Sequence, residues 1–211
     1  MSMDAGLVGH WKFNEKSGII ANDSSRYRNT GTLTGATHLP VWSDKGIKFD
    51  GVDDYVELSQ NYVFTSNNTL SFWAAIKQQN YLGVVGGNLG AYAFIRFGTA
   101  AGQENLNILI ETNTNGDYHT LIFNSPLSYN VYYHFIIVQD GSKVWRLWIN
   151  GILQSTTVTT TDNNLTIRKI GEGRQNVDYF NGSIDEVRIY NRALSAAEIK
   201  RHYEATKHNY I

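Results

Sequence analysis

An antiparallel β-sandwich of two sheets, with one short C-terminal helix, is the fold class that this sequence predicts. Turn dipeptides such as Asp50-Gly51, Asn115-Gly116 and Asn150-Gly151 recur along the 211 residues, and each supplies the positive-φ backbone of a tight hairpin turn. Short strand-like runs separate them, without the helical crossovers that parallel strands need. The composition agrees, because 13 Tyr, 5 Trp and only 2 Pro suit strands.

The strand-like runs are short, rich in aromatic and β-branched residues, and bounded by turn signals. In chain order they cover residues 7–13, 46–50, 55–59, 70–77, 91–98, 106–112, 118–123, 132–139, 143–150, 165–171 and 183–190. A β-sandwich of this length commonly forms one domain. We therefore expect an N-terminal tail at 1–5, a single domain at 6–204 and a C-terminal tail at 205–211.

One helix is expected, in LSAAEIKRHYEA at residues 194–205. Ser195 can cap its N-terminus, and Glu198 follows three residues later, which is the capping-box pattern. Ile199 and Tyr203 are four residues apart and give the helix one apolar face.

Composition excludes several classes of partner and site. The 18 basic and 19 acidic residues nearly cancel, and no basic run offers the patch that nucleic acid binding requires. No segment approaches the roughly 20 apolar residues of a membrane helix, so membrane insertion is not expected. The absence of Cys rules out disulfides and thiolate metal sites. The N-terminus lacks the pattern of a signal peptide.

The strand-like run at the C-terminal end, GSIDEVRIYN, contains a carboxylate that needs an explanation. Alternation places Asp185 on one face with Val187 and Ile189, and Glu186 on the other. A carboxylate on a core-facing position is costly unless it is paired, hydrogen-bonded or bound to metal. The sequence therefore predicts a specific partner for Asp185.

Five motifs in order resemble a known family. The chain carries LVGHWKFNEKSG, NDSSRYRNTGTLTG, IKFDGVDDYVELS, LWINGILQ and YFNGSIDEVRIYNRALSAAEI. Together they resemble the laminin-G-like jelly-roll modules of the concanavalin A-like lectin/glucanase superfamily, over roughly residues 7–59 and 134–204. The resemblance implies a jelly roll of two curved sheets with the first and last strands adjacent. Such modules occur as accessory domains in bacterial and phage proteins, and one fold hosts many functions.

The resemblance also implies a structural Ca²⁺. In such modules the D-S-S-x-x-x-x-N-x-G stretch lies near the last strand, whose I-D-E-V motif supplies a carboxylate. Carried onto this chain, the ligands are Asp23, Asn29 and Asp185. Arg26 and Arg28 stand where the family usually has glycines, so a salt bridge or hydrogen bonds could replace the metal. Either way, Asp185 is expected to tie the last strand to the loop after the first.

Catalysis is not expected. Asp50, Asp53, Asp54 and Glu57 cluster in FDGVDDYVEL, and some relatives in the superfamily hydrolyse glycosides with two carboxyl groups. Their signature, E-x-D-x-x-E along one strand, does not occur in this chain. Glycoside hydrolysis therefore stays the least favoured function.

Surface aromatics favour a carbohydrate ligand, since sugars stack on aromatic rings while polar groups bind their hydroxyls. In KVWRLWIN, Trp145, Leu147 and Ile149 should face the core, which turns Arg146 and Trp148 outward. The predicted ligand site combines these two with the similarly alternating Tyr92 and Arg96. The alternatives are that the aromatics fill the core, or that the loops 78–92 and 111–118 contact the ligand.

The function predicted on these grounds is a non-catalytic, lectin-like, carbohydrate-binding module, recognising a glycan or cell-surface polysaccharide outside the cell. The alternative is a phage or virion structural, decoration or adhesion protein, which would use the same sandwich as a platform for other virion or cell-surface proteins.

Overall fold

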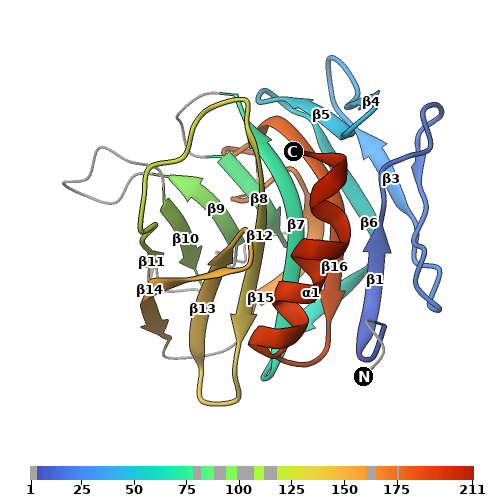
Figure 1. Ribbon diagram of the computed structural model, residues 1–211. Coiled ribbons are helices and arrows are strands. Elements are labelled where there is room, and N and C mark those ends of the chain that lie inside the picture. Colours follow the sequence, from blue (N-terminus) through green and yellow to red (C-terminus); the bar gives the residue numbers. More distant parts are fainter. Residues whose placement is uncertain are drawn as a thin grey trace.

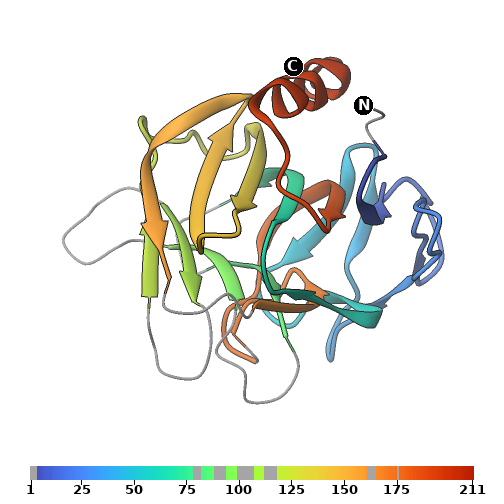
Figure 2. The same cartoon turned by 90° about the horizontal axis from the view of Figure 1, so that it is seen from below.

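The structure is a computed structural model that describes residues 4–77, 82–87, 94–98, 107–111, 118–160, 165–174 and 176–211. Within these ranges the chain forms two antiparallel sheets with one α-helix outside them (Figures 1 and 2). This is the all-β sandwich that the turn spacing predicts. No helix in these ranges is long and apolar enough to cross a membrane.

The first sheet contains both the N-terminal and the C-terminal strands. Its order is β14 (Ile152–Thr159), β13 (Val144–Ile149), β12 (Tyr132–Gln139), β7 (Asn68–Ile76), β16 (Asn181–Tyr190), β5 (Gly46–Asp50) and β4 (Val41–Ser43), with β1 (Leu7–Trp11) also paired to β16. The predicted adjacency of the first and last strands is therefore confirmed.

The second sheet packs against the first across the main core. Its order is β11 (Tyr118–Leu121), β10 (Asn107–Glu111), β9 (Phe94–Gly98), β8 (Leu82–Gly86), β15 (Leu165–Ile170), β6 (Tyr55–Phe64), β3 (Gly31–Thr34) and β2 (Ile20–Ala21). Side chains such as Trp11, Phe72, Phe97, Phe135 and Trp145 fill the main core between the sheets. Aromatic pairs there meet in stacked and edge-on arrangements, which add to the free energy of burial.

A second, smaller core lies on the outer side of the first sheet, under α1 (Ala196–Thr206). This outer core consists of Leu7, Ile136, Val138, Trp148, Tyr190, Leu194 and Ile199. The capping box predicted at the start of the helix is confirmed: the Ser195 side chain accepts from the Glu198 N–H, and the Glu198 carboxylate accepts from the Ser195 N–H. The helix covers β7 and β16 from outside (Figures 1 and 2).

The C-terminal end packs against the sheet, so the expectation of a loose tail at 205–211 is wrong. After α1 the chain continues in a 3₁₀ helix, η1 (Lys207–Asn209). The Tyr210 ring then stacks on Trp73 of β7 with ring centroids 4.0 Å apart. This stack buries aromatic surface that the outer face of β7 would otherwise expose.

A β-bulge in β16 explains the carboxylate at position 185. Glu186 has a φ of 51°, and the pairing with β7 shifts between Asp185 and Arg188. The extra residue reverses the alternation, so Ile184 and Val187 both face the main core. The predicted faces are wrong for this reason: Asp185 points outward, away from Val187. The bulge lies where β16 changes partner from β5 to β1.

Candidate ligand-binding groove

A groove of about 870 Å³ opens on the outer side of the first sheet, beside the C-terminal residues. Its floor is one row of outward-facing residues that crosses five strands. Tyr132 of β12 pairs with Ala75 of β7, Ala75 with Ser183 of β16, Ser183 with Lys48 of β5, and Lys48 with Val41 of β4. The small side chains of Ala75 and Ser183 in the middle of the row leave the hollow.

Tyr132 forms the aromatic part of the groove. Its hydroxyl donates to the Lys45 carbonyl at 2.6 Å, so the side chain reaches from β12 to the β4–β5 turn. The Tyr210 ring lies beside it, with centroids 5.2 Å apart, and the Lys45 ammonium is 5.8 Å from the Tyr132 centroid. Burial raises the pKa of Tyr132, so the phenol stays protonated as a hydrogen-bond donor at neutral pH.

Charged groups surround this row. Lys45, Lys48 and Lys77 are exposed around the groove, and no ion pair between described residues involves any of them. The acidic residues of the lining are Asp44, Asp50 and Asp54, and its exposed apolar residues are Leu39 and Val41. Apolar surface with a few convergent polar groups is the usual character of a small-molecule site.

The structure brings Asp23 and Asn29 together through hydrogen bonds. The Asp23 side chain is 2% exposed. One of its oxygens accepts from the His10 and Ser25 N–H groups at 2.9 and 2.7 Å. The other accepts from the Ser25 hydroxyl at 2.8 Å and the Asn29 N–H at 2.9 Å. Asp23 therefore fixes the loop after β1 by hydrogen bonds to the chain itself.

Asp185 is directed to the other end of the chain. One oxygen accepts from the Glu186 N–H at 2.8 Å, and the other accepts from the Tyr210 hydroxyl at 2.7 Å. Burial, the largest cause, raises the pKa of Asp185 to about 7. The expectation that Asp185 ties β16 to the loop after β1 is wrong, because its partner is Tyr210. In addition to the backbone pairing of β1 with β16, the Glu186 side chain links the two strands by accepting from His10 of β1. It also accepts from Arg188 of its own strand.

These residues do not fit a calcium ion. Calcium needs six to eight oxygens directed at one point, whereas the Asp23 and Asp185 oxygens point at separate N–H and O–H donors. Both Asp23 and Asp185 instead match the alternative that the sequence left open, in which the Asp is hydrogen-bonded rather than bound to metal. The Ca²⁺ expected at Asp23, Asn29 and Asp185 stays a prediction without support from this geometry.

Trp148 lies on the predicted side of β13 but is not exposed. Trp145 and Leu147 belong to the main core and Trp148 to the outer core, as alternation requires. The helix α1 covers that outer side, so Trp148 is only 8% exposed and cannot stack on a sugar. The expectation of an exposed indole is therefore wrong. Arg146 remains partly exposed and pairs with Asp140 at 2.5 Å.

Arg96 lies on the opposite side of the molecule from Arg146 and Trp148. It belongs to β9 in the second sheet, and its neighbours Ile95 and Phe97 face the main core, so Arg96 faces outward from that sheet. It is 6% exposed and pairs with Asp178 at 2.5 Å. The structure therefore does not combine the predicted ligand residues in one site. Tyr92, the loop 78–92 apart from residues 82–87, and residues 112–117 lie outside the described residues.

Comparison with known proteins identifies the family. A family model described as the concanavalin A-like lectin/glucanases superfamily matches residues 50–200, which is well over half of the chain. The chain belongs to this superfamily. Among curated proteins, none matches the sequence.

Solved structures with a similar fold include domains of two kinds of protein. The botulinum neurotoxin serotype D binding domain has a TM-score of 0.70 and 19% identity, covering 96% of this chain and 52% of that one. The same toxin's ligand-binding domain in complex with N-acetylneuraminic acid has a TM-score of 0.69 and 19% identity, covering 97% of this chain and 53% of that one. The chain thus spans about half the length of these toxin domains.

A second structure, from an arabinanase, is matched over nearly its whole length. Domain 4 of an extracellular arabinanase from Geobacillus stearothermophilus, solved with arabinotriose, has a TM-score of 0.65 and 18% identity. The match covers 92% of this chain and 97% of that domain. At these identities the likeness establishes the superfamily fold alone.

Sequence reasoning missed the groove of this superfamily member. Alternation along each strand could place Lys48, Ala75 or Ser183 outward, but only the register between strands shows that they lie side by side. The members of the row come from positions as distant as 41 and 183, and no local sequence motif indicates that they align.

Proposed function

We propose that this protein is a non-catalytic carbohydrate-binding module that holds a saccharide in the groove over Tyr132, Ala75, Ser183 and Lys48. The observation that carries the proposal is this row. It joins an aromatic ring, a hollow of small residues and the Lys48 ammonium group, which forms no ion pair with the residues that the structure describes. The groove volume of about 870 Å³ lies within the usual range for small-molecule sites.

The chemistry of the groove suits a sugar. An apolar CH face of a pyranose or furanose can pack against Tyr132, Leu39 and Val41, while Lys45, Lys48 and Lys77 can donate to ring and hydroxyl oxygens. Membership of the superfamily supports the proposal. So does the likeness to the arabinanase domain solved with arabinotriose, since that domain matches over nearly its whole length.

The groove supports binding of a glycan without its hydrolysis. Asp54, a lining carboxylic acid with a raised pKa, is 2% exposed, so it cannot approach a glycosidic oxygen as an acid must. The two toxin structures named above are binding domains, and the arabinanase domain was solved with a saccharide. We expect no release of reducing ends from any glycan that binds. The predicted setting outside the cell, and the alternative role in a virion, stay predictions.

A glycan array followed by calorimetry tests the proposal. We expect Lys48→Ala to weaken binding of the selected glycan about 10-fold or more, the loss of roughly 1.4 kcal/mol that one good polar contact contributes. Lys200→Ala is the matched control, because Lys200 is an exposed lysine on α1 outside the groove. Binding that is equal in wild type and Lys48→Ala would place the site elsewhere, and an array without signal would contradict the function itself.

A further inference from the structure

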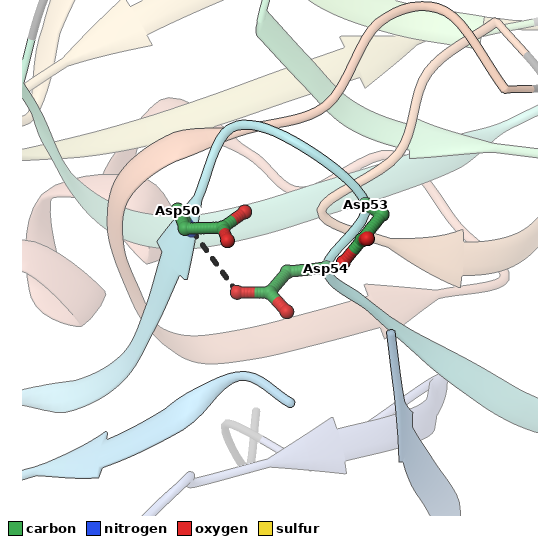
Figure 3. A group of neighbouring side chains, drawn as sticks. All are labelled: Asp50, Asp53 and Asp54. Atoms are coloured by element: carbon green, nitrogen blue, oxygen red, sulfur yellow. Dashed lines mark hydrogen bonds between the residues drawn. The ribbon is translucent and has the colours of Figure 1, made fainter. Parts of the chain in front are cut away.

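Three aspartates meet at the turn between β5 and β6, at one end of the groove. Asp50 ends β5, and Asp53 and Asp54 precede β6. Each offers one carboxylate oxygen within 4.8 Å of the others, and Figure 3 shows the three side chains around the turn. The turn itself depends on Gly51, whose φ of +83° is a conformation that glycine adopts at low cost.

One oxygen of each carboxylate is already hydrogen-bonded. Asp50 accepts from the Val52 N–H at 2.8 Å. Asp53 accepts from the Thr37 N–H and hydroxyl at 3.0 and 2.7 Å. Asp54 accepts from the Asp50 N–H at 3.0 Å (Figure 3). These bonds fix the carboxylates in position, and no hydrogen bond between described residues involves the second oxygen of any of them.

The second oxygens of Asp53 and Asp54 are buried and have no hydrogen-bond donor among the described residues. Asp54 as a whole is 2% exposed. A buried carboxylate oxygen without a donor or a cation is costly, and no ion pair between described residues neutralises any of the three aspartates.

We propose that Asp50, Asp53 and Asp54 together bind a calcium ion. Calcium prefers hard oxygen ligands, takes six to eight of them, and accepts carboxylates, carbonyls and water in a flexible geometry. The three carboxylates, with one oxygen of each within 4.8 Å of the others, supply the charged part of such a site. The ion reduces the repulsion between them and offers a cationic partner to the free oxygens of Asp53 and Asp54. This site is distinct from Asp23, Asn29 and Asp185, whose oxygens point at donors of the chain itself.

Thermal unfolding in chelator and in millimolar Ca²⁺ tests the site. A ligand that binds only the folded state raises its stability, so we expect calcium to raise the Tm of the wild type by a few degrees. Asp53→Asn and Asp54→Asn each keep an oxygen for the existing hydrogen bond but lose a charge, and should lose this rise. Asp44→Asn, an exposed aspartate of the same groove, should keep it. In chelator the two variants should be at least as stable as the wild type.

Terbium luminescence provides a second measurement that does not depend on stability. Tyr55 follows Asp54 directly, so excitation of tyrosine should sensitise Tb³⁺ bound at the cluster. We expect emission from the wild type that Ca²⁺ displaces, and none above background from Asp54→Asn. Because the measurement uses the metal alone, it stays separate from the carbohydrate proposal, which is tested in chelator as well as in calcium.

Two results would overturn the proposal. The first is a wild type whose Tm and terbium emission do not respond to calcium. The second is a response that persists in both Asp53→Asn and Asp54→Asn. If the response instead disappears in Asp23→Asn or Asp185→Asn, the ion lies at the site that the family resemblance implies.

Discussion

Trp145 and Trp148 lie close together on β13, yet they pack in different cores. Trp145 is fully buried between the sheets, stacks on Phe64 and donates from its indole N–H to the Thr160 hydroxyl. Trp148 belongs to the outer core together with Ile136, Tyr190 and Ile199 of α1. Each ring therefore contributes to stability, and neither presents an open face to a ligand.

Truncation of Trp148 should consequently destabilise the fold. We expect Trp148→Ala to lower the free energy of unfolding by about 3–5 kcal/mol, as truncation of buried Trp typically does, and to loosen α1 from the sheet. Denaturant unfolding followed by circular dichroism measures the change. Leu153→Ala is a suitable control, because Leu153 pairs with Trp148 across the strands but is 47% exposed. A Trp148→Ala variant as stable as wild type would show that the ring is not packed under the helix.

Single residues show where local rules hold and where they fail. Strand alternation placed Trp145 and Trp148 on opposite sides correctly, because alternation depends only on the backbone of β13. It could not show that a helix from the C-terminus covers one side. At Asp185 the alternation itself breaks, and the apolar residues at 184, 187 and 189 already contain that signal, since their spacing is three and then two.

At the scale of elements, α1 is fixed by polar contacts at its start and aromatic contacts at its end. Arg192 donates to both oxygens of Glu198 at 3.0 and 2.8 Å, and these contacts lower the pKa of Glu198 to about 2. At the other end, the Trp73 indole N–H donates to the Thr206 hydroxyl at 3.0 Å. The Ser195 capping signal was visible in the sequence, whereas the docking partners come from distant strands.

A buried histidine makes this attachment sensitive to acid. His202 is 1% exposed, and its Nε2 atom lies 3.3 Å from the Tyr190 hydroxyl oxygen. Burial, and then the positive charge of Arg188, lower the pKa of His202 to about 4. His202 therefore takes up a proton near pH 6.5 in the unfolded chain but only near pH 4 in the folded chain. As a result, the free energy of unfolding decreases as the pH falls from about 6.5 toward 4.

We therefore expect His202→Gln to lose less stability on acidification than the wild type. Between pH 7 and pH 5 the free energy of unfolding of the wild type should fall by about 2 kcal/mol more than that of His202→Gln, from the linkage of one proton. Denaturant unfolding at each pH measures it. His208→Gln, which replaces an exposed histidine, should follow the wild type. Identical pH profiles for wild type and His202→Gln would contradict the burial of the neutral ring.

At the scale of the whole molecule, the fold was largely predictable and the groove was not. Turn dipeptides and five ordered motifs are local features of the sequence, and they suffice for an antiparallel sandwich with its end strands paired. The groove depends on the register of five strands that meet in the order β12, β7, β16, β5 and β4. Tyr132, Ser183 and Lys48 lie far apart in the chain, so their alignment appears only in three dimensions.

The proposed saccharide should bind over this row of residues. A titration with the glycan selected on an array, followed by ¹H–¹⁵N NMR of the backbone amides, tests it most directly. We expect the largest shift changes at Ala75, Ser183, Lys48 and Tyr132, with little change at Trp148 or Arg96. Shift changes that gather instead on the outer side of the second sheet, around Arg96, with the Ala75 and Ser183 signals unmoved, would contradict it.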